Sequence, residues 1–338
     1  MNINIIEIVT NKKYILFFIG WYILLYPFID VSAQQIPLFS QYTFSPFLLN
    51  PAAAGAEGYT TISITSRNQW LGIKDAPRIY SASGQTRFMK QSHIRKGVPV
   101  KRKYKNNLRG GRVGIGFNIY SFHAGQINQT GAQFTYAYHI SFRKTSQLSM
   151  GTSLLYLKYK ISTDNLELTD KTDDPVYNNR ISMNIPDINI GVYYTDQNKY
   201  IGLSILQLLR ASINFSHYEN EDLRIYRHVY LIAGYRYNLN SVDVLEPSIF
   251  LKSSEQLKFQ IDASLKYTRD NKFWIGIGYR SGLTFIGTVG LSLHKLYIGY
   301  SYDYSPKGLL NYSYGSHEIM LAIKMGDNAR RYRYLDRY

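Results

Sequence analysis

The feature that most constrains this chain is an alternation of apolar and polar residues with period two, which recurs from residue 59 onward. In residues 133–142, QFTYAYHISF, the even positions are Phe, Tyr, Tyr, Ile and Phe, and the odd positions are Gln, Thr, Ala, His and Ser. Residues 259–267, FQIDASLKY, repeat the pattern. Because successive side chains of a β-strand point to opposite faces, each segment predicts a strand with one apolar and one polar face.

Alternation alone also fits a soluble β-sandwich, but three features favour a membrane barrel. The strands often reach nine or more residues, near the length that crosses a bilayer at a tilt. Asp262 and Lys266 lie on the polar face within a strand, as a wet lumen would allow. Tyr and Phe, which number 32 and 16 among 338 residues, gather at strand ends like aromatic girdles. We therefore predict an all-β fold, a transmembrane antiparallel up-and-down outer-membrane β-barrel.

The pattern predicts about fourteen strands, an even number, as bacterial single-chain barrels have. They cover residues 59–66, 79–88, 112–121, 132–142, 148–158, 187–194, 200–206, 229–237, 245–251, 258–267, 273–280, 284–293, 296–304 and 316–325.

The N-terminal 33 residues resemble a secretory signal peptide. Lys12 and Lys13 precede an apolar run over 14–26, and small residues at 31–33 offer a cleavage site. A membrane anchor is the alternative, but the run is short for a span and Pro27 interrupts it. The predicted domains are thus a signal peptide over 1–33, a periplasmic segment over 34–58 that plugs the barrel or contacts its mouth, the barrel over 59–325, and a basic tail over 326–338.

The lengths of the links predict the orientation of the barrel. With both ends in the periplasm, the two longest outward links are 159–186 and 207–228, and most inward links are tight turns, as in outer-membrane barrels. The inward link 89–111 departs from this rule because it is long and basic, with Lys101, Arg102 and Lys103 at its centre. It is either a solvated loop, a docking arm for an acidic periplasmic partner, or a loop that faces lipopolysaccharide on the outside.

Other function classes find less support in the sequence. The formal charge of +16 fits nucleic acid, but an anionic membrane surface or an acidic partner fits as well, and we expect no nucleic acid. The seven His residues show no metal-ligand spacing, and the chain has no Cys. Ser316, His317 and Glu318 suggest part of a triad, but neighbours on one strand point to opposite faces. We expect no enzyme activity, no metal and no cofactor, although a barrel-embedded hydrolase built from distant residues stays open.

Several blocks in order carry a family resemblance. They are FSQY at 39–42, NPA at 50–52, RNQW at 67–70, YAYHI at 136–140 and GSHEI at 315–319. Together they resemble the PorP/SprF family of outer-membrane proteins, which belongs to the type IX secretion system and the linked gliding machinery of Bacteroidetes. The resemblance implies a barrel that helps to export large surface proteins, including adhesins, or to retain them through their C-terminal sorting domain. It also implies partners in the periplasmic ring and a peptidoglycan-binding component.

Two sets of residues are the candidate partner contacts. Arg67, Asn68, Gln69 and Trp70 fall at the outer end of the first strand, either as a polar rim with an interfacial Trp or as a contact for cargo. The second set is Lys101, Arg102 and Lys103. A pore for small solutes in the outer membrane is the alternative function, because a fourteen-strand barrel leaves a lumen unless side chains or a segment fill it.

Overall fold

The computed structural model describes residues 38–88, 112–141, 146–161, 182–210, 212–213, 223–256, 258–306 and 313–325. The strands of the first half are β1 (Thr60–Asn68), β2 (Arg78–Phe88), β3 (Val113–Ala124), β4 (Ile127–Ser141), β5 (Gln147–Ile161), β6 (Ser182–Thr195), β7 (Lys199–Leu206), β8 (Ser212–Ile213) and β9 (Leu223–Arg224). Those of the second half are β10 (His228–Tyr235), β11 (Tyr237–Asn238), β12 (Asp243–Ser254), β13 (Phe259–Arg269), β14 (Phe273–Arg280), β15 (Thr284–Leu293), β16 (Leu296–Tyr304) and β17 (Ser316–Met325).

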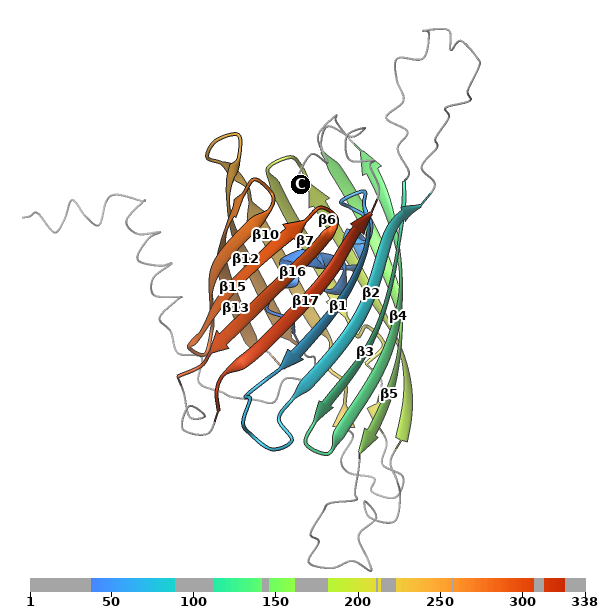
Figure 1. Ribbon diagram of the computed structural model, residues 1–338. Helices are drawn as coiled ribbons and strands as arrows, with labels where there is room; N and C mark the ends of the chain where they lie inside the picture. The colour runs from blue at the N-terminus through green and yellow to red at the C-terminus, as the bar shows by residue number, and fades with distance from the viewer. Residues whose placement is uncertain are drawn as a thin grey trace, which may run out of the picture.

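Fourteen of these strands close into one antiparallel barrel, as the alternation predicted (Figure 1). Each strand pairs with its neighbours in sequence, and the first and last strands, β1 and β17, pair over their whole length. The short β11 continues β10 along β12, and the ladder is interrupted opposite Pro247, which has no N–H to donate. The separate hairpin of β8 and β9 was not predicted.

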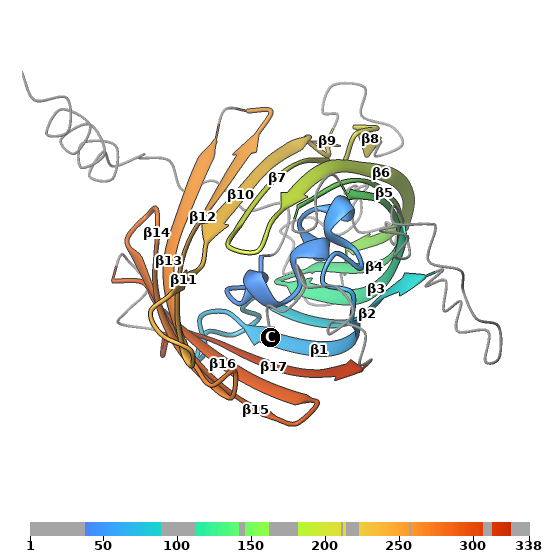
Figure 2. The same cartoon turned by 90° about the horizontal axis from the view of Figure 1, so that it is seen from above.

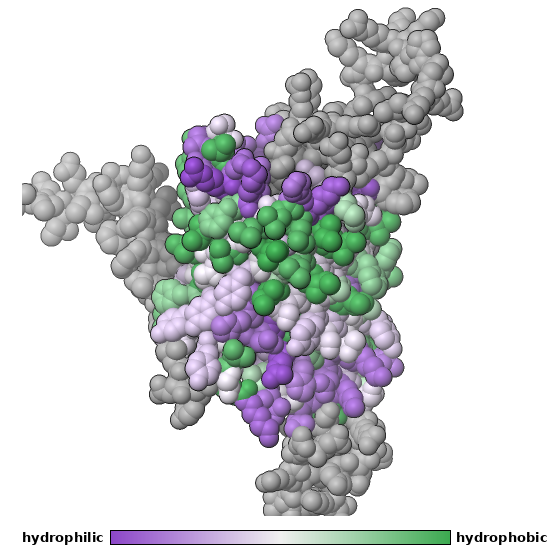
Figure 3. Space-filling model, in the orientation of Figure 1, coloured by the Kyte–Doolittle hydropathy of each residue, from purple (hydrophilic) through white to green (hydrophobic). Residues whose placement is uncertain are grey.

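The two faces of the barrel wall have opposite character. Large apolar side chains point outward, with Ile64 59% and Ile277 67% exposed. The alternate positions point inward and are polar and buried, as with Ser63 and Asp262. On the outside, an apolar band lies between two hydrophilic margins (Figure 3), which matches a lipid-facing surface. Among the described residues, no helix has the length and apolarity to cross a membrane.

The two ends of the barrel differ in what they carry. Thr60 at the start of β1 pairs with Met325 at the end of β17, so both lie at one end, called the terminal end here. It is uppermost in Figure 1. The opposite end, called the loop end, carries the links from β1 to β2, β5 to β6 and β7 to β10.

The observed strands match the predicted ones closely, and the last four have the predicted bounds. The largest differences are at the starts of β4 and β6, which begin at Ile127 and Ser182 rather than at residues 132 and 187. Pro186 lies in the added part of β6, whose partner strand β7 reaches only Ile190. On that unpaired edge a missing N–H disrupts no ladder. The signal peptide, the link 89–111 and the tail over 326–338 lie outside the described residues.

Residues 38–57, called the plug here, lie inside the barrel (Figure 2). They form three single-turn 3-10 helices, η1 (Tyr42–Phe44), η2 (Pro46–Leu48) and η3 (Pro51–Ala53). A Pro opens η2 and η3, where its fixed φ and missing N–H are tolerated. The side chain of Asn50 caps η3 by accepting a hydrogen bond from the N–H of Ala52. Most plug residues are buried, and their apolar side chains form the main core.

Candidate functional site

The contact between the plug and the barrel wall holds a buried network of charged and polar groups. It begins at Glu318 on β17, whose side chain is fully buried. One carboxylate oxygen accepts the backbone N–H of Ser40 at 2.7 Å, and the other accepts that of Gln41 at 2.9 Å. Glu318 therefore holds the plug by its main chain.

Arg67 joins this contact from β1. Its guanidinium lies 3.1 Å from a carboxylate oxygen of Glu318 and 2.6 Å from one of Asp303 on β16. It also donates to the hydroxyl of Ser40 at 2.6 Å. Arg67 is only 2% exposed. The expectation that Arg67 forms part of an outer rim is corrected by this placement, because its position in the alternation directs the side chain into the lumen.

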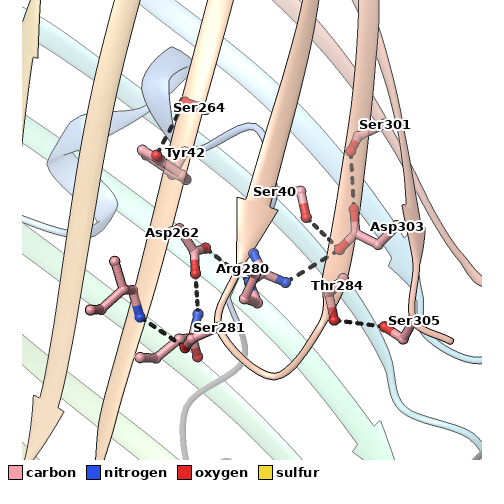
Figure 4. A network of polar contacts seen from close by, with 12 residues as sticks. Ser40, Tyr42, Asp262, Ser264, Arg280, Ser281, Thr284, Ser301, Asp303 and Ser305 are labelled. Carbon is pink, nitrogen blue, oxygen red and sulfur yellow. Dashed lines mark hydrogen bonds and ion pairs between the residues drawn. The ribbon is translucent and has the colours of Figure 1, made fainter. Parts of the chain in front are cut away.

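A second arginine extends the network along the wall (Figure 4). Arg280 on β14 lies 2.9 Å from Asp262 on β13 and 3.3 Å from Asp303. The hydroxyl of Ser40 donates to Asp303 at 2.7 Å. Three carboxylates thus face two guanidinium groups, and the two plug N–H groups supply the remaining donors that a buried carboxylate needs.

The hydroxyl of Tyr42 marks the next point of contact on the plug. It lies 3.5 Å from the hydroxyl of Ser264 on β13, and its ring packs against Phe250 with centroids 5.3 Å apart. Burial raises the pKa of the Tyr42 hydroxyl above its usual value, so the group stays neutral.

The other half of the plug is seated on the wall of β4 to β7. The amide of Asn50 donates to the backbone carbonyls of Val192 and Leu203, at 2.9 and 3.2 Å. The hydroxyl of Ser204 donates to the carbonyl of Leu49 at 2.6 Å. The NPA block therefore forms a capped turn that also bonds two adjacent strands.

His139 on β4 fixes the end of the plug. Its Nε2 lies 2.9 Å from the carbonyl oxygen of Ala54, and its Nδ1 lies 2.7 Å from the hydroxyl of Ser149. The side chain of Gln85 on β2 accepts the N–H of Gly55 at 3.0 Å. His139 is 1% exposed and both ring nitrogens have partners, so it serves as a structural histidine.

Two wall glycines allow the plug to approach this closely. A Cβ on Gly114 would lie 1.9 Å from the carbonyl oxygen of Ala54, and one on Gly151 would lie 2.4 Å from the N of Ala52. Any larger residue at either position would displace the plug or the strand.

The remaining predicted rim residues stay near the loop end. Asn68 and Gln69 are half-buried, and Trp70 is 36% exposed with a positive φ of 49°. The next residue, Leu71, exchanges two backbone hydrogen bonds with Tyr314 and Gly315, which ties the link after β1 to the segment before β17. Lys101, Arg102 and Lys103 lie outside the described residues.

A cleft remains between the plug and the wall of β12 to β15. Tyr42 and Phe44 line it from the plug, and Ser264, Lys266 and Trp274 line it from the wall. Gly276 and Gly278 keep this part of the wall free of side chains. Among the described residues, no three His, Asp or Glu side chains gather as a metal site would need.

The motif blocks converge at the plug. Ser40, Gln41 and Tyr42 come from FSQY, Asn50 from NPA, Arg67 from RNQW, His139 from YAYHI and Glu318 from GSHEI. Sequence reasoning assigned no partner to Glu318 or His139. The signal for Glu318 was a charged residue on the polar face of a strand, but its partners lie 251 and 278 residues away.

A family model described as type IX secretion system membrane protein PorP/SprF matches residues 31–323. No curated protein sequence matches.

Several solved barrels are similar in structure at low identity. Omp33 from Acinetobacter baumannii has a TM-score of 0.42 and 8% identity, covering 80% of this chain and 99% of that one. CdiB from the same species has a TM-score of 0.41 and 10% identity over 79% of this chain, which spans only 60% of CdiB. A triple mutant of the Rhodopseudomonas blastica porin has a TM-score of 0.33 and 6% identity, covering 79% of this chain and 99% of that one.

Proposed function

This chain belongs to the PorP/SprF family of type IX secretion system membrane proteins, and on that premise we propose that it is a non-enzymatic binding component for secreted cargo. In this proposal, it sits in the outer membrane and binds large cargo proteins through their C-terminal sorting domain, assisting their export and attachment to the surface. Its other partners are components of the same machinery, the periplasmic ring and a peptidoglycan-binding protein.

The observation that carries the proposal is the filled lumen. The plug occupies the barrel and is held by Glu318, Arg67, Asn50 and His139. A barrel whose inner polar groups bind its own N-terminal segment is suited to contact partners at its ends. His317 also points outward, toward Tyr300, while Glu318 points inward. This separation supports a role without a catalytic triad at that block.

The cargo contact is proposed for the loop end. Trp70, Leu71 and Tyr314 are 36%, 44% and 76% exposed there. The backbone bonds between Leu71 and the segment at 314–315 hold them in one place. Exposed aromatic residues on a fixed backbone are frequent anchors of protein interfaces.

Surface proteomics of a deletion strain tests the proposal. We expect that one or a few large proteins disappear from the cell surface and return when the wild-type gene is supplied. Supplying the double variant Trp70→Ala and Tyr314→Ala should restore the barrel in the membrane but less than a tenth of the cargo. An unchanged surface proteome in the deletion strain would refute the proposal.

The predicted basic link offers a test of the periplasmic partners. Reversing the charges of Lys101, Arg102 and Lys103 to Glu should weaken the salt-sensitive co-purification of a secretion component. If the co-purification is unchanged by the reversal and by salt, the link is only a solvated loop.

The cleft beside the plug supports the second candidate, a pore for small solutes. Conductance of the purified protein in planar bilayers separates the two functions. Large steady currents from the wild-type protein would favour the pore, and small or absent currents would favour the binding component.

A further inference from the structure

The lipid-facing side of β1 to β6 changes character abruptly near the loop end. One row of paired outward residues across these six strands is apolar or nearly so, and it consists of Ile64, Ala82, Ile119, Ala132, Tyr156 and Pro186. The next two rows toward the loop end are polar throughout. We call these two rows the polar belt.

The registers of the strands define the polar belt. Its inner row consists of Ser66, Tyr80, Ser121, Thr130, Lys158 and Asn184, and its outer row of Asn68, Arg78, His123, Asn128, Lys160 and Ser182. All twelve residues have the same parity as the exposed Ile64, Ile119 and Tyr156 of their strands. They therefore face away from the lumen, on the surface that continues the apolar band.

The polar belt contains basic and neutral polar side chains but no acidic ones. Arg78, Lys158 and Lys160 are the basic residues of the belt, and all three are exposed. The other members are hydroxyl, amide, imidazole and phenol groups, and none of the twelve carries a carboxylate. Within the part of the chain that the structure describes, the three cations form no ion pair. The belt thus offers many donors and no acidic group.

The dimensions of the polar belt suit a lipid headgroup larger than a single phosphate. Six strands span about 24 Å across the wall, and Lys158 and Lys160 lie about 7 Å apart along their strand. Tyr80 and Tyr156 are 54% and 50% exposed at its inner border, where aromatic side chains meet an interface.

At the opposite margin, the described residues of β1 to β6 present no charged side chain outward. There, β4 presents Tyr138 and Ile140, and β5 presents Met150, all outward and exposed. The two ends of these strands therefore present different chemistry to the two leaflets of the membrane. Of the three longest links, two leave the loop end and one, the link from β2 to β3, leaves the terminal end. On the predicted orientation, with both ends of the barrel in the periplasm, the polar belt lies in the outer leaflet.

We propose that the polar belt is a docking surface for the phosphorylated glycolipid of the outer leaflet. Arg78, Lys158 and Lys160 bind its phosphate groups, and the hydroxyl and amide side chains bind its sugars. The acyl chains pack on Ile119, Tyr156 and the apolar band below. Cations with flexible stems at a membrane interface attract anionic headgroups.

The test measures lipid binding by the purified, full-length protein in detergent. The probes are phosphorylated lipid A, the same lipid without phosphate, and phosphatidylglycerol as the other anionic source. The variant combines Arg78→Gln, Lys158→Gln and Lys160→Gln. The control combines Arg112→Gln, Lys199→Gln and Lys272→Gln, which removes one Arg and two Lys from the terminal end.

We expect the belt variant to bind phosphorylated lipid A at least tenfold more weakly than the wild type, and the control to stay within twofold. The wild type should also bind the lipid without phosphate at least tenfold more weakly than it binds phosphorylated lipid A. Equal binding by the belt variant, or phosphatidylglycerol binding as tight as that of lipid A, would overturn the proposal. Heat-modifiable migration in gel electrophoresis checks that the variants fold. If they do not fold, the comparison of phosphorylated and phosphate-free lipid A binding to the wild type tests the proposal, and equal binding of the two lipids overturns it.

Discussion

At the scale of single residues, Arg67 shows that the place of a residue in the alternation decides whether its side chain faces the lumen or the outside. Its position near the end of β1 suggested a rim contact, but inward parity gives it Asp303, Glu318 and Ser40 as partners. A charge that is buried in this way needs nearly complete pairing, because desolvation costs several kcal/mol for each ion.

Replacing Arg67 with Met tests this pairing. We expect the free energy of unfolding in lipid vesicles to fall by about 3–5 kcal/mol, because Glu318 and Asp303 lose a buried partner. Guanidinium titration measures the change. Lys272→Met is the control, since its ion pair with Asp270 is exposed and contributes about 0–1 kcal/mol. Equal losses for both variants would contradict the prediction.

The wall glycines give a second prediction at this scale. In Gly114→Val, the new side chain meets the carbonyl of Ala54 and should push the plug off the wall. Ala53→Cys can report the displacement of the plug. The chain has no other Cys, and Ala53 is only 1% exposed while the plug is in place. Maleimide should label that Cys at least tenfold faster in the Val variant. Gly287→Val, where a Cβ meets nothing within 4 Å, should leave labelling unchanged.

At the scale of elements, the strands differ in length because some of them extend beyond the end of a shorter partner strand. Adjacent strands β4 and β5 have 15 residues each, whereas β7 and β10 have eight. β6 extends past its partner β7, and the N–H of Leu208 bonds the carbonyl of Ile188 where the pairing stops. Pro186 follows on this free edge, where its lack of an N–H leaves no donor unsatisfied.

The plug is the element whose removal is most informative. Without residues 38–57 the fourteen-strand ladder is still complete, because no strand pairs with the plug. We expect the deleted protein to fold with heat-modifiable migration and to conduct at least tenfold more current in planar bilayers than the full-length protein. Loss of folding would contradict the expectation and show that the barrel needs the core contributed by the plug in order to fold. Unchanged current would show that the plug does not limit passage.

At the scale of the whole molecule, the outward band should behave as a lipid-facing surface. Leu321 lies within it, 44% exposed and paired with Ile64. Leu321→Arg should destabilise the protein in lipid vesicles by about 2–4 kcal/mol, because a charge is costly near the bilayer midplane. Ser121→Arg, in the polar belt, should cost about 0–1 kcal/mol. The same unfolding titration compares the two, and an equal effect would argue that the band does not face lipid.

The sequence by itself determined the barrel, the number of its strands and most of their ends. Period-two alternation is a local property, because the sequence of each strand shows which of its faces is apolar. Antiparallel strands that are neighbours in sequence need only short connections, so their order follows as well. The bounds of β14, β15, β16 and β17 follow from that pattern together with the turn residues between them. The motif blocks were visible for the same reason, as short strings within one segment.

Only the tertiary structure decided what those blocks do. Closing the barrel brings Glu318, Arg67 and His139 around one lumen and sets them against Ser40, Asn50 and Ala54 of the plug. Alternation assigns a side chain to the inner face but gives no information about which residue lies across the lumen. The strand registers and the path of the plug settle those partners, and they depend on contacts between residues that are up to 278 positions apart.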